Sequence, residues 1–367
     1  MNLDQLPRFP DQPDPNRVRS ILEQLACPFT QLNYVHVTGT NGKGSTAAMV
    51  AAMAQASGQT VGLFTSPHLW KYNERIKLNG VDISDAVLQQ YLDRVEPLLP
   101  AGSCLFEVMT IIALCYFCDQ QVDVAVLEVG LGGRLDPTNS IPHNIALITN
   151  VGLEHQELLG ATLAEIAREK AGIIKPQSVC FTTEPDPAVR AVIQAVADKQ
   201  QAKLHYIDGD NGALATACAR QLGISDQAIQ QGLATVHWPL RFETIHTHPL
   251  VIADIAHNPH GLAYVQQHIR TAFPDRRKII VTGCAQGRPY QVMMPMIAEL
   301  GDTIIVTQSK RNGMPVEQLA PYLPPTSYLI PDIQQAVQQA MALAQPNDVV
   351  LILGGIYLTA EVTACYN

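Results

Sequence analysis

Short apolar runs rich in β-branched residues recur along the chain and alternate with longer segments of helical character. Such runs lie at residues 34–37, 122–129, 144–149, 179–182, 250–255, 278–282, 303–307 and 348–353. Strands that alternate with helices predict parallel sheets covered by helices on both faces. The pattern therefore predicts an α/β fold.

The alternation changes character in the stretch HWPLRFETIHTHP, residues 237–249. A helical segment there gives way to prolines and aromatic residues, and a new series of strands and helices follows. A chain of 367 residues is also too long for one compact core. We expect two domains, at residues 1–246 and 247–367.

The first apolar run leads into the glycine-rich stretch TGTNGKGST, residues 38–46, and then into an Ala- and Met-rich segment of high helix propensity. Glycines let backbone N–H groups converge on an anion, and the start of a helix adds its positive dipole end. Lys43 supplies a mobile charge, and Ser45 and Thr46 are placed to offer a hydroxyl to Mg²⁺. The stretch predicts a phosphate-binding loop.

This loop is a variant of the G-x-x-x-x-G-K-[ST] pattern. Val37 stands where the first glycine is expected, and Gly44 separates Lys43 from the hydroxyl residues. The alternative interpretation is a glycine-rich turn that only caps a helix. The strand before the loop and the helix after it favour phosphate binding.

Charge and hydropathy narrow the classes of protein. The 24 Lys and Arg residues against 33 Asp and Glu give a net charge of −9, which argues against a nucleic-acid partner. No apolar run reaches the ~18 residues that a membrane span needs, and the N-terminal stretch lacks the apolar core of a signal peptide. We expect a cytoplasmic protein.

Eight cysteines are scattered along the chain, mostly within apolar sequence, as is typical of reduced and buried thiols. Cys115 and Cys118 form a C-x-x-C motif, but no second pair lies nearby. Their setting, FEVMTIIALCYFCDQQ, indicates a buried helix. We therefore interpret them as core residues rather than as a zinc or redox site.

Residues that end strands are candidates for function, because ligands of open α/β sheets bind beyond the carboxyl ends of the strands. Glu128 ends one run, and a lone glutamate after Val, Ala and Leu in a phosphate-loop domain favours a place facing Mg²⁺ or its water over a surface position. Asn150 ends another run and leads to His155, for which a functional and a structural role are equally open.

Asp254 ends a run in the second half of the chain, and His257 follows it. Both could belong to a site, or they could cap the helix that begins near residue 259. The pairs 246/248 and 257/260 are histidines with metal-like spacing. No further ligands for them can be identified, so we do not predict a transition-metal site.

Several motifs together resemble the folylpolyglutamate synthase/dihydrofolate synthase family, a branch of the Mur-type ATP-dependent amide ligases. They are HVTGTNGKGST, TSPHLWKYNERIKLNG, FEVMTIIAL, LEVGLGGRLDPTN, LGATLAEIAREKAGIIK, WPLRFE, DIAHNPH and, more loosely, GGIYLTAEV, in order from residue 35 to residue 362. The resemblance implies a Mur-ligase-like phosphate-loop domain with a parallel-sheet core, and a smaller Rossmann-like α/β domain after it.

The activity that this resemblance implies is the ATP-dependent joining of L-glutamate to dihydropteroate, to a folate, or to both. ATP would phosphorylate the substrate carboxylate, and the amine of glutamate would then displace phosphate. Implied cofactors are ATP, Mg²⁺ and a monovalent cation. The expected partners are these small molecules alone, without nucleic acid or membrane, bound to a monomer.

The resemblance also implies roles for single residues. Gly39, Thr40, Asn41, Gly42, Lys43, Gly44, Ser45 and Thr46 would hold ATP. Ser66, Glu128 and His155 resemble the magnesium ligands. Lys170 matches a lysine that is carbamylated in the family, although an ordinary helix-surface lysine is the alternative.

Four further residues carry roles over from the family. Asn211 resembles an asparagine on the adenine side, and Arg241 matches an arginine that reaches the phosphates at the domain join. Asp254 and His257 resemble residues of the C-terminal domain that close over the nucleotide. Lys43, His155, Lys170 and Arg241 are the expected catalytic set.

The second half of the chain departs from the family's pattern. Asp208 stands where a glutamine is usual, and Ile255 replaces a glycine. The stretch QGRPY, residues 286–290, replaces Asp-Lys-Asp, and Gly355 replaces a serine. These changes leave two alternatives open: a ligase that acts on another carboxylate, and a nucleotide-binding protein without ligase activity.

The residues of the N-terminal half argue against the non-catalytic alternative, because Lys43, Ser66, Glu128, His155 and Lys170 occur together. A phosphate-loop GTPase is a further alternative in principle. The chain has no N-K-x-D segment to read guanine, which favours ATP.

Overall fold

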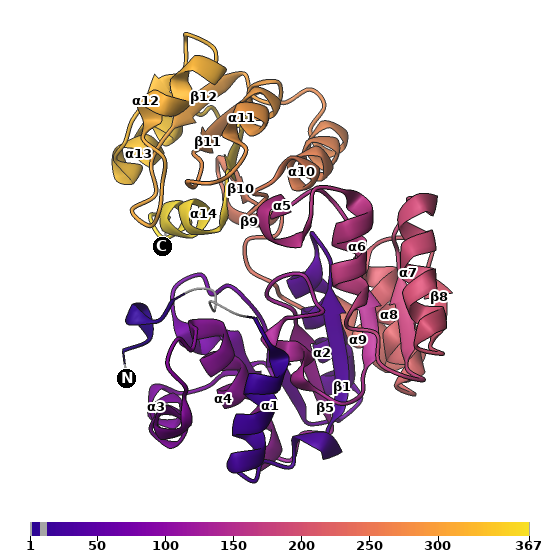
Figure 1. Ribbon diagram of the computed structural model, residues 1–367. Helices are drawn as coiled ribbons and strands as arrows, with labels where there is room; N and C mark the ends of the chain where they lie inside the picture. The colour runs from indigo at the N-terminus through magenta and orange to yellow at the C-terminus, as the bar shows by residue number, and fades with distance from the viewer. Residues whose placement is uncertain (1, 8–12, 367) are drawn as a thin grey trace. The chain divides into compact units, whose positions relative to one another are not determined.

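The structure is a computed structural model that describes residues 2–7 and 13–366. It divides into two compact units, Met1–His237 and Trp238–Asn367, each built from one sheet and the helices around it (Figure 1). In this division residues 238–246 belong to the second unit, whereas the sequence placed them with the first. Within the described residues, no helix combines the length and apolar character needed to cross a membrane.

The sheet of the first unit has eight strands in the order β4-β3-β2-β5-β1-β6-β7-β8. Six neighbouring strands of this sheet are parallel, in the order β2, β5, β1, β6, β7 and β8. Strands β3 and β4 extend the sheet beyond β2 with antiparallel pairing. Their bounds are β1 (Asn33–Thr38), β2 (Val61–Phe64), β3 (Ile76–Leu78), β4 (Val81–Asp82), β5 (Val124–Glu128), β6 (Ile145–Ile148), β7 (Val179–Thr182) and β8 (Lys203–Tyr206).

Helices cover both faces of this sheet. They are α1 (Pro15–Gln24), α2 (Lys43–Ala56), α3 (Asp85–Val95), α4 (Leu105–Asp119), α5 (Gln156–Leu159), α6 (Leu163–Ala171), α7 (Pro187–Lys199), α8 (Asn211–Gln221) and α9 (Asp226–Thr235). Short 3₁₀ turns are η1 (Leu3–Gln5), η2 (Phe29–Gln31), η3 (Tyr72–Arg75), η4 (Glu96–Leu98) and η5 (Pro137–Ser140).

The two faces of the sheet follow from the strand register. His36 pairs with Leu127 on one side and with Ala146 on the other, so these three side chains point to the same face. That face packs against α1, α3 and α4 over one part and against α6 and α7 over another. Helix α2 packs with α8 and α9 against the sheet. The α/β architecture predicted from the sequence is confirmed.

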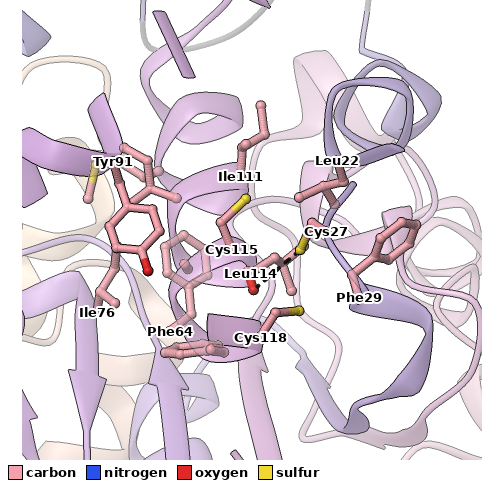
Figure 2. Packing of buried hydrophobic residues seen from close by; sticks show 14 of the residues in the cluster. Leu22, Cys27, Phe29, Phe64, Ile76, Tyr91, Ile111, Leu114, Cys115 and Cys118 are labelled. Carbon is pink, nitrogen blue, oxygen red and sulfur yellow. Dashed lines mark hydrogen bonds between the residues drawn. The ribbon is translucent and has the colours of Figure 1, made fainter. Parts of the chain in front are cut away.

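The C-x-x-C motif lies inside α4, in the hydrophobic core that this helix shares with the sheet (Figure 2). Figure 2 shows Cys27, from the connection after α1, pointing toward Cys115 and Cys118, with its thiol donating to the carbonyl of Leu114 over 3.9 Å. A hydrogen bond with Cys27, together with burial, raises the pKa of both α4 thiols. The expected buried helix is confirmed, and its thiols pack as core residues.

The sheet of the second unit has six strands in the order β13-β12-β11-β14-β10-β9, all parallel except β9. Its strands are β9 (Glu243–Thr247), β10 (Leu250–Ala253), β11 (Lys278–Thr282), β12 (Thr303–Val306), β13 (Tyr328–Leu329) and β14 (Val349–Leu353). Its helices are α10 (Pro259–Ala272), α11 (Tyr290–Ala298), α12 (Val316–Leu319), η6 (Ala320–Tyr322), α13 (Ile333–Leu343) and α14 (Ile356–Thr363). Side chains of β10, β11, β12 and β14 on one face pack against α10, α11 and α12.

Candidate active site

The glycine-rich loop joins β1 to α2, as the sequence predicted. Gly39 has φ of +149°, and a Cβ atom there would lie 1.8 Å from the hydroxyl oxygen of Thr149. Gly42 has φ of +82° at the N-cap of α2, in the left-handed region that favours glycine. Both positions disfavour a side chain, so no side chain at these two residues covers the backbone of the loop before α2.

Lys43 is the first residue of α2, and its side chain folds back over the loop. Its ammonium donates to the carbonyl oxygens of Gly39 at 3.0 Å and of Thr40 at 3.1 Å. The hydroxyl of Thr46 donates a hydrogen bond to the carbonyl oxygen of Gly42 at 2.9 Å. Ser45 is half-buried, so part of it remains accessible. The positive charge of Lys43 therefore lies at the loop, and Ser45 is the better placed of the two hydroxyls to meet a ligand.

The segment 149–152, just after β6, brackets the loop from the neighbouring strand. The backbone N–H of Thr40 donates to the carbonyl of Asn150 at 2.8 Å, and that of Asn41 donates to Oδ1 of the same residue at 3.0 Å. The N–H of Gly152 donates to the Thr40 hydroxyl at 2.8 Å. The sequence identified Asn150 only as the end of an apolar run. The contacts of Asn150 with the loop after another strand cannot be read from the residues of its own strand.

Ser66 and Glu128 meet at the carboxyl ends of β2 and β5. The two strands are parallel neighbours, with Phe64 beside Leu127, so the residues that follow lie side by side. The backbone N–H of Ser66 donates to Oε2 of Glu128 at 2.9 Å. Glu128 is 4% exposed, which excludes the surface position that the sequence left open.

His155 occupies the N-cap of the short helix α5 with φ of +50°. Its Nδ1 lies 3.6 Å from Oε1 of Glu157, and its Nε2 lies 3.8 Å from Oε1 of Glu154. In the described part of the chain, no group of three or more His, Cys, Asp and Glu side chains could hold a metal ion. Ser66 and Glu128, by contrast, are in contact through the Ser66 backbone N–H, and a serine hydroxyl and a carboxylate are oxygen ligands of the kind that Mg²⁺ prefers.

Lys170 lies near the end of α6, whose start is fixed by a capping box between Thr162 and Glu165. Only 4% of Lys170 is exposed, so it is not a helix-surface lysine. Burial, together with the charge of Lys43, lowers the pKa of Lys170 from 10.5 to about 7, and the charge of Glu154 opposes this fall. The amine is therefore available in its neutral, nucleophilic form near neutral pH.

Asn211 is the first residue of α8, and its side chain lies directly against the phosphate loop. A Cβ atom on Gly42 would come within 2.2 Å of Nδ2 of Asn211. Asp210 caps the helix by accepting from the backbone N–H groups of Gly212 and Ala213. The sequence placed Asn211 by resemblance alone, and the structure brings it to the start of α2.

In the second unit, Arg241, Asp254 and His257 influence one another. The Asp254 carboxylate accepts from the backbone N–H of Phe242 at 2.9 Å and of Ala256 at 2.7 Å. Burial raises the pKa of Asp254, and the charges of Arg241 and His257 oppose that rise. The cap of α10 is Asn258, which accepts from Gly261, so capping by Asp254 or His257 is excluded as an explanation for them.

The structure shows the local surroundings of the substituted positions in the second unit. Gly355 has φ of +134°, a conformation in which a serine would be strained. The stretch QGRPY joins β11 to α11, and Gln286 pairs with Asn312 through a backbone hydrogen bond of 2.9 Å. Ile255 is buried and donates to the carbonyl of Leu240.

Two family models match the chain. The model described as the Mur ligase middle domain covers residues 37–241, and the one described as the Mur ligase glutamate ligase domain covers residues 240–356. The folylpolyglutamate synthase of Lacticaseibacillus casei is 33% identical over 97% of this chain and 95% of its own length. A probable bifunctional folylpolyglutamate synthase/dihydropteroate synthase of Haloferax volcanii is 31% identical, and this chain spans about half (49%) of its length.

Solved structures share the whole fold. E. coli FolC in complex with DHPP and ADP has a TM-score of 0.93 at 28% identity, covering 99% of this chain and 95% of the other. The bifunctional folylpolyglutamate synthase/dihydrofolate synthase of Yersinia pestis, complexed with AMPPNP and Mn, has a TM-score of 0.91 at 30% identity, with the same coverage. A bifunctional enzyme of this type with Mn, AMPPNP and L-glutamate bound has a TM-score of 0.89 at 30% identity, again covering 99% and 95%.

Proposed function

The chain belongs to the folylpolyglutamate synthase/dihydrofolate synthase family of Mur ligases and is an ATP-dependent glutamate ligase; on this basis we propose its acceptors and the roles of its residues. We propose that it joins L-glutamate to dihydropteroate, to a folate, or to both. Supporting this choice, relatives are named for both activities, and their structures hold DHPP in one case and L-glutamate in another.

The contact between Ser66 and Glu128 carries the proposal, because it brings a serine and a buried carboxylate together where two strands end. Strand β5 is the neighbour of β1, which leads into the phosphate loop. Oxygen ligands beside such a loop suit a divalent cation that accompanies ATP. We assign Ser66, Glu128 and His155 to holding Mg²⁺ or Mn²⁺, which when bound would neutralise phosphate charge.

The chemistry begins with a carboxylate, which is inert because its oxygen is a poor leaving group. Transfer of the γ-phosphoryl group of ATP to that oxygen gives an acyl phosphate and ADP. The amine of L-glutamate then attacks the acyl carbon, forms the amide and expels inorganic phosphate, with loss of one proton. Lys43 holds its charge at the phosphate loop, where it meets the negative charge that develops on the transferred group.

Lys170 is proposed to carry a carbamate. Its neutral amine would attack CO₂, form an N–C bond and release a proton, which turns a cation into an anionic group with two oxygens. The lowered pKa of Lys170, to about 7, supports this step because only the neutral amine is a nucleophile. In the family such a group binds metal, and the coupling of Lys170 to Lys43 is consistent with a place near the loop.

The remaining residues are assigned to the nucleotide. The loop residues 39–46 and Asn211 would bind ATP, Asn211 on the adenine side. Arg241 would bind the phosphates, and Asp254 and His257 would complete nucleotide binding. The support for these three is their mutual arrangement in the second unit, where two backbone N–H groups fix the Asp254 carboxylate beside Arg241.

The test is phosphate release from Mg-ATP with L-glutamate and dihydropteroate, tetrahydrofolate or no acceptor, followed by mass spectrometry. We expect a gain of one glutamate on at least one acceptor, and loss of turnover in Lys43→Ala. Lys199→Ala, in the last turn of α7, is the matched control and should behave as the parent. A parent protein that hydrolyses ATP without extending either acceptor would instead indicate a different carboxylate substrate, as the substitutions in the second unit allow.

A further inference from the structure

A buried carboxylate stands at the end of β7 and has no role in the reaction described so far. Glu184 follows the strand by two residues and is 2% exposed. Strand β7 is the parallel neighbour of β6, so the segment after β7 lies beside the segment after β6. Glu184 is therefore one strand removed from the residues that bracket the phosphate loop.

The Glu184 carboxylate accepts two backbone hydrogen bonds. Its Oε2 accepts from the N–H of Val151 at 2.6 Å, and its Oε1 accepts from the N–H of Asp186 at 3.0 Å. A buried carboxylate is tolerated only when donors replace its water, and hydrogen bonds to an ionised oxygen are the stronger kind. The bond to Val151 therefore holds the segment after β6 firmly to the end of β7.

That segment is in turn bonded to the phosphate loop. Asn150 and Gly152 flank Val151, and both exchange hydrogen bonds with Thr40 or Asn41 of the loop. A further tie comes from the hydroxyl of Thr183, which donates to the carbonyl of Thr149 at 2.7 Å. A continuous path of hydrogen bonds thus runs from Glu184 through residues 149–152 to Thr40 and Asn41.

We propose that Glu184 is a positioning residue for ATP binding. By holding the backbone of Val151, Glu184 fixes the position of the segment 149–152. This segment in turn fixes the orientation of the backbone N–H groups of Thr40 and Asn41 in the phosphate loop. The inference rests on the proposed role of that loop as the ATP site. A carboxylate suits the position because both of its oxygens accept, whereas the NH₂ of a glutamine would face one of the two N–H donors.

The same contacts could serve stability alone, so the test separates binding from folding. The variants are Glu184→Gln, which keeps the size and one acceptor, and Glu184→Ala, which removes both. The control is Asp186→Asn, since the side chain of Asp186 caps α7 through Ala188 and leaves the bonds of Glu184 intact. Each variant is assayed for the Kd of the non-hydrolysable analogue AMPPNP with Mg²⁺, for KM of ATP and of glutamate, and for Tm.

We expect Glu184→Gln to stay folded and to weaken AMPPNP binding and raise the KM of ATP by about tenfold, the worth of roughly one charge-assisted hydrogen bond. Glu184→Ala should weaken binding further. The KM of glutamate, and all constants of Asp186→Asn, should stay within about twofold of the parent. Should Glu184→Ala fail to fold, Glu184→Gln decides.

A Glu184→Gln protein that is folded and binds AMPPNP like the parent would overturn the proposal. So would a rise in the KM of glutamate equal to that for ATP, because a general loosening of the fold predicts it. If the parent itself does not bind AMPPNP, the proposed function of the loop fails first, and that outcome is recognised before any variant is compared.

Discussion

The backbone N–H of Ser66 donates to the Glu128 carboxylate over 2.9 Å, and this single bond joins the ends of two parallel strands. The bond helps to orient Glu128 within the first unit. Because it uses a backbone donor, it persists when the side chain of residue 66 changes. The charge of Glu128 can therefore be tested separately from its position.

Glu128→Gln keeps an oxygen for the Ser66 N–H but removes the negative charge that would attract a divalent cation. We expect kcat to fall by ~100-fold or more, since loss of a metal contact removes several kcal/mol of transition-state stabilisation. The half-saturating Mn²⁺ concentration should rise in steady-state assays. Glu23→Gln, an exposed change on α1, serves as control. Equal metal dependence of Glu128→Gln and the parent would contradict this role.

Gly42→Ala tests the close approach of Asn211 to the loop. The alanine would be strained by about 1–2 kcal/mol at φ of +82°, and its Cβ would displace the Asn211 amide. Gly58→Ala is a matched control, because Gly58 has φ of +88° near the other end of α2 and no atom lies within 4 Å of an added Cβ. Denaturant unfolding should show the strain of a positive φ in both variants, and a further loss of stability in Gly42→Ala from the displaced Asn211 amide.

Only the change at Gly42 should weaken ATP binding, measured by calorimetry with AMPPNP. If both alanine variants bound the nucleotide as the parent does, the contact between Asn211 and the loop would have no part in binding. If both bound it equally poorly, backbone strain in α2 alone would account for the effect.

Lys170 predicts a pH dependence of stability. Its pKa is about 7 in the folded protein and 10.5 ordinarily, so between these values the unfolded chain binds more protons. The free energy of unfolding should therefore rise with pH through this window, and the buried charge should destabilise the protein most below pH 7. Lys170→Met should remove that part of the rise, as measured by denaturant titration at several pH values in buffers free of CO₂.

Lys175 also makes the free energy of unfolding rise with pH, because burial lowers the pKa of Lys175 to about 8. Lys175 is present in both the parent and Lys170→Met, so its contribution is the same in the two proteins. The parent should thus keep a steeper rise than Lys170→Met, and Lys175→Met should lose a different, higher part of the window. Identical profiles of parent and Lys170→Met would mean that Lys170 has an ordinary pKa.

The cysteines predict a simple pattern of reactivity. Cys365 is exposed and the other seven thiols are buried. A thiol reagent such as DTNB should modify one cysteine in the native protein and eight after unfolding. Burial raises the pKa of Cys365, so its reaction should be slow at neutral pH and faster in alkaline buffer.

The matched variant for this experiment is Cys365→Ser, which should leave no thiol that reacts in the native protein. Rapid modification of Cys115 or Cys118 in the native protein would contradict their placement in the core.

Strands buried on both faces were predictable, because continuous apolar runs are their signature. All eight predicted runs overlap strands of the structure, from β1 to β14. The edge strands β4, β8, β9 and β13, and β3 beside β4, were not predicted, since they are short, partly exposed and lack that signature. The short β2 was missed as well, although it is fully buried, because Gly62 interrupts its apolar run.

The sequence by itself determined the α/β architecture, the glycine-rich turn between a strand and a helix, and the family, because each depends on residues close together in the chain or on motifs in a set order. Only the tertiary structure decided that Ser66 touches Glu128, that Asn211 lies against Gly42 and that Lys170 is buried with a lowered pKa. It also decided that Glu184 holds Val151. These contacts join residues from different strands and helices, and parallel sheets bring such residues together through long crossovers that no local pattern records.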